Sequence, residues 1–254
     1  MVDFFNPLHV NWEVWLLTLL VAFLAGVSKS GIKGIVMIGI PILATLYGAK
    51  LSTGILLPFL IFGDIIAIHL YLKYAKIGCI IKLLPYAIGG IIIAVVAGKF
   101  INDRWFTNIM AVVMLVCVIL ILLNDLRKGS TDGVVNHRLF SPIFGLTGGF
   151  ATMIGNLAGP IFNLYLITIK LPKKEFIGTG ASFYLILNLI KIPFHFFVWE
   201  TITLSSLQMN VVMLPAVIGG AFLGSWLVKL IPEKVYRYLI LCFTSLSALL
   251  LFFK

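Results

Sequence analysis

Two glycine-rich stretches interrupt the otherwise apolar sequence and hold the polar side chains best suited to bind a ligand. The first stretch, residues 26–34, places Ser28, Lys29, Ser30 and Lys33 among three glycines. Glycine lets the backbone turn and expose its N–H groups, and the N-terminus of a restarting helix attracts negative charge. With hydroxyl donors and lysine ammonium groups close by, this stretch predicts a site for a small anion.

The second stretch, residues 148–160, corresponds to the first and adds further side-chain donors. Polar, non-helical backbone at membrane depth is tolerated only where it is buried in protein or lines a wet cavity. The predicted substrate-binding residues are Ser28, Lys29, Ser30, Gly31, Lys33, Gly34, Thr152, Gly155, Asn156 and Gly159. The alternative is that the two lysines extend from an ordinary short turn to the membrane surface.

A second group of ionisable side chains lies inside apolar runs. Asp64 is flanked by Gly63 and Ile65 in one run, and a carboxylate at that depth is costly and therefore a functional candidate. Asn188 occupies the matching depth in a later run, and Lys191 follows it by about one helical turn. An Asp64–Lys191 ion pair could be structural, or Asp64 could carry a proton; the sequence leaves both possibilities open.

His195 follows Lys191 by four residues, which places both side chains on one face of a helix. A histidine changes its charge near neutral pH and could relay protons, or it could be a hydrogen-bonded residue near the membrane interface. Asp64, Asn188, Lys191 and His195 are the predicted coupling or gating residues.

The elements that must position these residues are membrane-spanning helices. The chain is 61% hydrophobic with a mean hydropathy of +1.12, and apolar runs long enough to cross a bilayer recur throughout it. The sequence predicts an all-α membrane protein with about ten transmembrane or re-entrant segments. These are Val14–Ser30, Ile32–Ala49, Thr53–Leu72, Ile80–Gly98, Trp105–Leu123, Leu139–Gly155, Ala158–Ile169, Phe176–Trp199, Leu207–Val228 and Val235–Phe253.

The two halves of the chain repeat each other. The phrase Leu-Pro-x-x-Ile-Gly-Gly begins at Leu84 and again at Leu214, an offset of 130 (214 − 84), and Asp64 matches Asn188 at an offset of 124 (188 − 64). Five segments per half is an odd number, so the second half would start on the opposite side of the membrane, as in transporters with inverted repeats. We expect a first repeat at 1–123, a cytoplasmic linker at 124–138 and a second repeat at 139–254.

Basic residues set the expected orientation. If the N-terminus lies outside, twelve of the 19 lysines and arginines fall on the inner side and four on the outer side. Both termini are therefore predicted to lie outside the cell. The protein itself is expected in the cytoplasmic (inner) membrane. The net charge of +10 is spread over short loops rather than gathered in a basic stripe, so we expect no nucleic-acid partner.

The sequence carries no motif of an enzyme. It has no His-Glu-x-x-His metal spacing, nucleophile elbow or phosphate-binding loop, so we expect no catalytic residue, metal or cofactor. The three cysteines lie in or beside apolar runs and are best explained as buried apolar side chains. The expected partners are a small anion and the lipid bilayer.

These features resemble the TauE/SafE family of membrane permeases, also called the sulfite exporter family. The resemblance rests on the breaks at 26–34 and 148–160, each followed by an apolar segment, and on the paired Leu-Pro-x-x-Ile-Gly-Gly phrases. Lys33 and Asn156 stand where the family more often has glycine. The resemblance implies a secondary transporter, with export as the expected direction, of sulfur-containing anions such as sulfite, thiosulfate or sulfonates. An anion channel and a membrane-embedded assembly factor are the alternatives.

Overall fold

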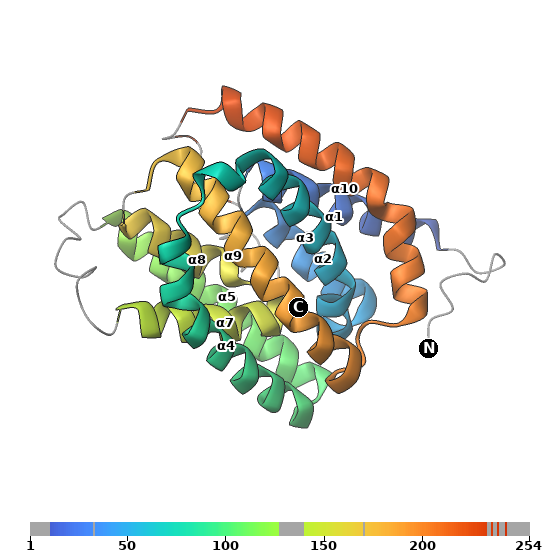
Figure 1. The fold of residues 1–254 in the computed structure, drawn as a ribbon. Helices are drawn as coiled ribbons and strands as arrows, with labels where there is room; N and C mark the ends of the chain where they lie inside the picture. Colours follow the sequence, from blue (N-terminus) through green and yellow to red (C-terminus); the bar gives the residue numbers. More distant parts are fainter. Residues whose placement is uncertain are drawn as a thin grey trace.

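The computed structural model describes residues 11–32, 34–126, 140–169 and 171–232, together with Val235, Tyr238 and Cys242. Within these residues all regular elements are helical (Figure 1). The first group is α1 (Trp12–Ser30), η1 (Ile35–Ile38), α2 (Gly39–Tyr47), α3 (Ala49–Tyr71), η2 (Leu72–Tyr74), α4 (Ile77–Phe100) and α5 (Asp103–Leu126). The second group is α7 (Phe140–Gly155), α8 (Ala158–Thr168), α9 (Lys173–Pro193), the π-helical turn η3 (Phe194–Val198) and α10 (Leu204–Leu230).

Five helical stretches of the described chain are long and apolar enough to cross a membrane. They are Trp12–Ser30, Ala49–Tyr74, Ile77–Phe100, Lys174–Val198 and Leu204–Leu230. The all-α membrane class is thus confirmed, whereas the count of ten segments stays a prediction because most of the segment at 235–253 lies outside the described residues. The same holds for residues 127–139, which include most of the expected linker; α5 continues to Leu126, beyond the boundary expected at 123.

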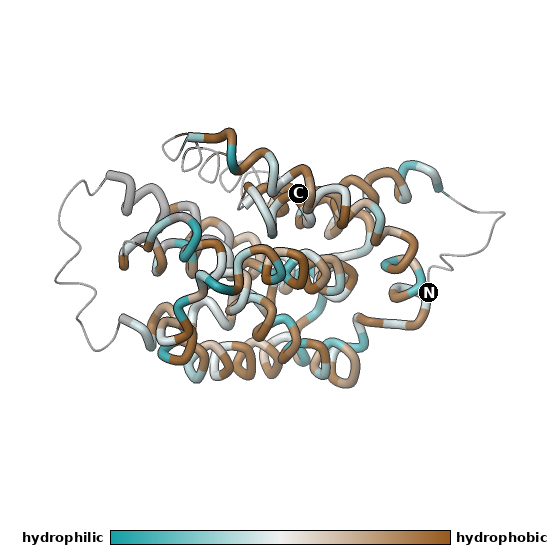
Figure 2. Tube along the Cα trace, turned by 45° about the horizontal axis from the view of Figure 1, so that its top comes forward, coloured by the Kyte–Doolittle hydropathy of each residue, from teal (hydrophilic) through white to brown (hydrophobic). Residues whose placement is uncertain are grey.

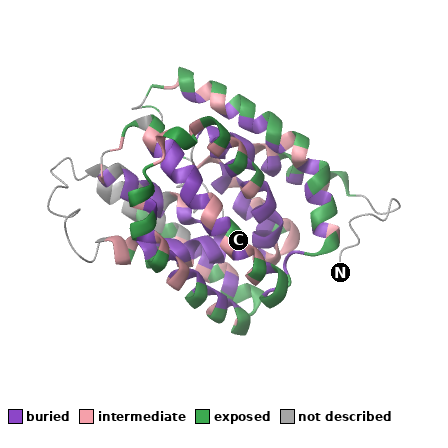
Figure 3. Cartoon of the chain, viewed as in Figure 1, coloured by how far each residue is buried: buried purple, intermediate pink, exposed green. Residues whose placement is uncertain are grey.

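The outward faces of the helices are apolar, as a protein surrounded by lipid requires. Phe100 is 80% exposed and Leu204 is 74% exposed, which would be unfavourable in water. Hydrophobic residues recur along all the long helices (Figure 2), and the buried residues lie on the faces turned toward the centre of the bundle (Figure 3). The buried ionisable residues Lys29, Asp64, Lys191 and His195 therefore stand out as functional candidates.

Each glycine-rich stretch forms the turn of an antiparallel helical hairpin. Near the open end of the first hairpin, the hydroxyl oxygens of Tyr47 on α2 and Thr18 on α1 lie 2.7 Å apart. In the second hairpin, the rings of Phe144 on α7 and Tyr165 on α8 lie 6.0 Å apart. Both turns are largely buried, so the chain goes into the protein, turns at its centre and comes back.

Backbone-to-backbone packing joins the hairpins to the long helices (Figure 1). A Cβ on Gly26 of α1 would overlap the Val217 carbonyl oxygen of α10, and a Cβ on Gly149 of α7 would overlap the Ala87 carbonyl oxygen of α4. These two contacts are related by offsets close to those of the sequence (149 − 26 = 123; 217 − 87 = 130). Small residues allow this close approach of the backbones. In lipid, the van der Waals packing it permits stabilises the contact between helices in place of hydrophobic burial.

The central helices α3 and α9 repeat the same relation. A Cβ on Gly54 of α3 would overlap the Thr201 carbonyl oxygen, and a Cβ on Gly178 of α9 would overlap the Tyr71 carbonyl oxygen. The offsets are again 124 and 130 (178 − 54 = 124; 201 − 71 = 130). The two hairpin turns therefore meet around a crossing of α3 and α9, and this crossing positions the candidate site.

Helix ends next to the site are fixed by side-chain caps. The Asp103 carboxylate accepts hydrogen bonds from the backbone N–H groups of Ala49 and Lys50, at 3.1 and 2.8 Å, and so caps the start of α3. At the start of α10, Thr203 and Ser206 form a reciprocal capping box. These caps provide acceptors for backbone N–H groups at the starts of α3 and α10.

Candidate functional site

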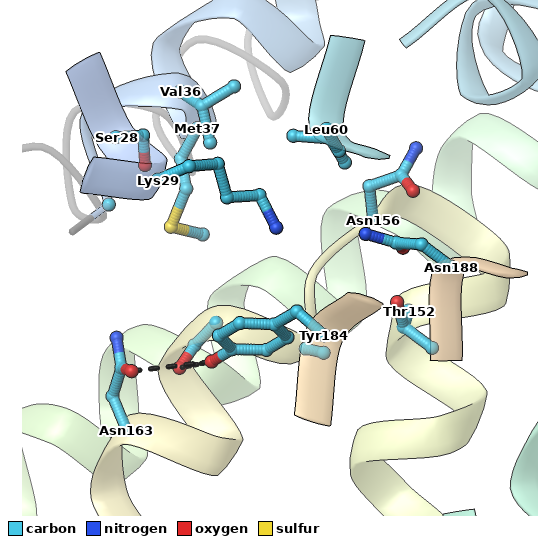
Figure 4. A pocket seen from close by; sticks show the side chains of 13 residues that line it. Ser28, Lys29, Val36, Met37, Leu60, Thr152, Asn156, Asn163, Tyr184 and Asn188 are labelled. Carbon is cyan, nitrogen blue, oxygen red and sulfur yellow. Dashed lines mark hydrogen bonds between the residues drawn. The ribbon is translucent and has the colours of Figure 1, made fainter. Parts of the chain in front are cut away.

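A small cavity of about 50 Å³ lies between the two hairpin turns, where the sequence predicted the anion site. Figure 4 shows its side chains arriving from α1, η1, α3, α7, α8 and α9. The lining residues are Ser28, Lys29, Gly34, Val36, Met37, Leu60, Thr152, Asn156, Ala158, Gly159, Asn163, Tyr184 and Asn188. Since a water molecule needs about 10–15 Å³ of such space, the cavity has room for a few waters or one small anion.

Lys29 brings a buried positive charge to the cavity. Its Nζ donates to Oδ2 of Asp64 at 2.9 Å, and Asn188 Nδ2 donates to the same oxygen at 2.8 Å. Asp64 is 0% exposed, so its carboxylate depends on these two donors for its stability inside the protein. The turn of the first hairpin, α3 and α9 are thus joined at one carboxylate oxygen.

The suggested pairing of Asp64 with Lys191 is wrong. The carboxylate of Asp64 pairs with Lys29, and the Lys191 ammonium donates to neutral oxygens of the second hairpin. Its acceptors are the carbonyl and hydroxyl oxygens of Thr152, both at 3.1 Å, and Oδ1 of Asn156 at 2.6 Å. Lys29 lies on α1 and Lys191 on α9. The side of α9 that carries Lys191 faces the C-terminal end of α7.

Tyr184 is a cavity residue that the sequence analysis missed. The Lys29 ammonium lies 4.7 Å from the centre of its ring, within the range of a cation–π interaction. Its hydroxyl lies 3.3 Å from the Gly159 carbonyl oxygen and from Oδ1 of Asn163 (Figure 4). A tyrosine inside an apolar run carries no sequence signal of its own, because the same residue is common at helix packing surfaces.

The backbone at both turns takes conformations that expose polar groups. Gly34 has φ +96°, a left-handed value that glycine adopts without strain, and it precedes η1. Asn156 has φ 58°, where asparagine is among the better-tolerated residues, and it separates α7 from α8. Ala158 and Gly159 then open α8 at the cavity wall, so the positive end of that helix faces the site.

Three of the predicted substrate-binding residues point away from the cavity. The Ser30 hydroxyl donates to the Ala221 carbonyl oxygen of α10, Gly31 packs against Gly224, and Gly155 packs against Met110. They shape the turns but do not line the cavity. Ser28, Lys29, Gly34, Thr152, Asn156 and Gly159 do line it. Lys33 lies outside the described residues.

His195 lies on the π-helical turn η3, apart from the cavity. Its Nδ1 is 2.7 Å from the Thr201 hydroxyl oxygen, and its ring meets the ring of Trp199 edge-on with centres 5.3 Å apart. The side chain is fully buried inside the protein. Among the predicted coupling or gating residues, Asn188 alone lines the cavity. Asp64 and Lys191 form hydrogen bonds to residues of the cavity wall, and His195 does not reach it.

Two lysines and one aspartate are buried around the cavity: Lys29, Lys191 and Asp64. With all groups ionised, Lys29 and Lys191 outweigh Asp64 by one charge. Hydroxyl and amide donors and the start of α8 surround the same space, an arrangement that can hold a small anion. Within the described residues no group of three or more His, Cys, Asp or Glu side chains is placed to hold a metal ion.

A family model described as "Sulfite exporter TauE/SafE" matches residues 17–251 of the chain. The match covers 235 of the 254 residues (251 − 17 + 1 = 235), which includes both hairpin turns and every residue that lines the cavity. No curated protein and no solved structure matches the chain.

Proposed function

Because the chain belongs to the sulfite exporter TauE/SafE family of membrane permeases, we propose that it is a secondary transporter that exports small sulfur-containing anions such as sulfite, thiosulfate or sulfonates. The observation that carries this proposal is the cavity between two helix breaks, with the buried Lys29 on its wall. Transporters built from repeats place their substrates near the midplane at such breaks, with helix N-termini facing anionic groups.

Lys29 and the start of α8 would bind the anion. The Lys29 ammonium reaches the cavity beside Tyr184, and the first residues of α8, Ala158 and Gly159, line the same space. Thr152, Asn156 and Asn188 line the wall beside them. Asp64 holds Lys29 in the absence of an anion and competes for it when an anion enters, so the Lys29–Asp64 pair would gate or couple transport.

We further propose that the halves 1–123 and 139–254 are inverted repeats, joined by a cytoplasmic linker at 124–138. The related glycine contacts of α1–α10 and α4–α7, and those of Gly54 and Gly178, support a two-fold axis in the membrane plane. The two hairpins would then be re-entrant, one from each side, and alternating access would arise when one repeat rocks against the other. The excess of lysine and arginine on the inner side supports external termini and a location of the protein in the inner membrane.

The proposal is tested with purified protein in liposomes. Labelled sulfite, thiosulfate, short sulfonates and carboxylates are offered separately, and uptake is followed against concentration. Saturable, protein-dependent flux of the sulfur anions is the expected result. Flux that rises linearly with concentration would indicate a channel instead, and no flux of any anion would refute a transport function.

Lys29→Ala is the matched site variant and Lys82→Ala its control, because Lys82 is an exposed lysine on α4. Charge-assisted hydrogen bonds contribute about 1.5–3 kcal/mol, so Lys29→Ala should weaken anion binding about ten- to a hundredfold in a titration of the purified protein. Lys82→Ala should leave the affinity unchanged. Equal effects of both changes would reduce Lys29 to a structural or topological role.

A further inference from the structure

Lys191 has an unusual environment for a lysine. Its side chain is 0% exposed and is among the largest fully buried side chains of the described residues. The three hydrogen-bond acceptors of its ammonium are all uncharged: a backbone carbonyl, a threonine hydroxyl and an asparagine amide oxygen, at 3.1, 3.1 and 2.6 Å. A buried ammonium is usually stabilised by a carboxylate, so these neutral oxygens call for an explanation.

The three oxygens form a shell of the kind that binds a monovalent cation. Two of them belong to Thr152 in the last turn of α7, where the helix dipole presents its negative end. Backbone carbonyls at the C-terminal ends of broken helices coordinate the coupling cation in many transporters with repeats. The ammonium of Lys191 lies where such a cation would be held.

The shell is fixed before any ligand arrives. Asn156 Nδ2 donates to the Thr53 carbonyl oxygen on α3 at 3.1 Å, which turns Oδ1 of the same amide toward Lys191. The left-handed backbone of Asn156 places this amide at the end of α7. The second hairpin is thereby held against both central helices through one residue.

We propose that the Lys191 ammonium is a tethered cation that occupies a monovalent-cation site at the end of α7, so that the protein holds its anion without a dissolved Na⁺. The inference deepens the proposed function, since the fixed charge stands directly behind Thr152 and Asn156 on the cavity wall. Its consequence is that anion binding needs no sodium, because the positive charge is part of the chain.

The test removes the tethered cation and offers a free one. Lys191→Ala leaves the oxygens of Thr152 and Asn156 around a vacated space, and the melting temperature of the purified variant is measured in NaCl and in N-methylglucamine chloride at equal ionic strength. At a Na⁺ concentration about ten times its Kd, mass action predicts a rise of a few degrees in Na⁺. Wild type and Lys82→Ala should melt at the same temperature in both salts.

The hydroxyl of Thr152 supplies a second control. Thr152→Val in the Lys191→Ala background removes one oxygen of the shell at nearly constant volume, and the Na⁺ effect should be lost or much reduced. If Lys191→Ala does not fold, Lys191→Ser takes its place in the same comparison, because its small hydroxyl leaves the space open and adds an oxygen to it.

Two results would overturn the inference. One is a folded variant at position 191 whose melting temperature is the same in both salts; the other is a wild type stabilised by Na⁺ as strongly as the variant. Neither measurement uses an anion substrate. The cation-site inference is therefore tested independently of whether transport is found in liposomes. If transport is found, replacing Na⁺ by N-methylglucamine on both sides should leave wild-type flux unchanged.

Discussion

The Lys29–Asp64 ion pair gives the sharpest prediction for stability. Both groups are buried, and their 2.9 Å bond is shared with Asn188 on the same carboxylate oxygen. Removing one partner of a buried pair leaves the other charge uncompensated and costs about 3–5 kcal/mol, whereas removing both is often nearly neutral. We therefore expect Asp64→Asn and Lys29→Met each to destabilise the protein, and the double variant to recover most of the loss.

The expected size of the effect follows from the length of the chain. For a domain of this length, 1 kcal/mol shifts the melting temperature by about 2–4 °C, so each single variant should melt about 6–20 °C below wild type. The four proteins of the cycle are compared by thermal unfolding in one detergent. Asp64→Asn with Lys191→Met is the control cycle, because Lys191 bonds to Thr152 and Asn156 rather than to Asp64.

Two outcomes would contradict the structural pair. If the single losses add in the Lys29→Met/Asp64→Asn variant to within about 0.5 kcal/mol, the two groups are not coupled. If Asp64→Asn instead folds as stably as wild type but abolishes the pH dependence of transport in liposomes, Asp64 acts as a proton carrier. A larger coupling energy in the Lys191 cycle than in the Lys29 cycle would show that Asp64 pairs with Lys191 rather than with Lys29.

Two further predictions concern the orientation and the packing of the helices. A cysteine at Ser130, with the three native cysteines removed, should resist an impermeant thiol reagent in intact cells, because the linker is expected in the cytoplasm; ready labelling would reverse the orientation. Gly220→Ala should lower the melting temperature, since overpacking costs about 1–3 kcal/mol and the new Cβ would overlap the Phe23 carbonyl oxygen. Its neighbour Gly219 has open space there, so Gly219→Ala should be neutral or stabilising by up to about 1 kcal/mol, and equal losses at both positions would refute the close contact.

The sequence by itself determined the class of the protein and the place of its breaks. Hydrophobic composition and the length of apolar runs can be counted directly in the sequence. In lipid, a long apolar run forms a helix because a helix satisfies its backbone hydrogen bonds within the segment. The turns after Ser30 and Gly155 could be predicted for the same reason, because glycine clusters act on the backbone where they occur. The cavity accordingly lies between the two predicted stretches.

Only the tertiary structure decided which polar groups meet. Lys29 and Lys191 both lie within predicted membrane segments, and their positions in the sequence do not tell which of them reaches Asp64. The rotation of each helix about its axis settles this, because a side chain on α9 a few residues along points to a different neighbour. The same reason explains why Tyr184 belongs to the site although it was not predicted, and why Ser30 does not although it was. The directions of their side chains depend on how α1, α9 and α10 pack. That packing is set by contacts between residues far apart in sequence.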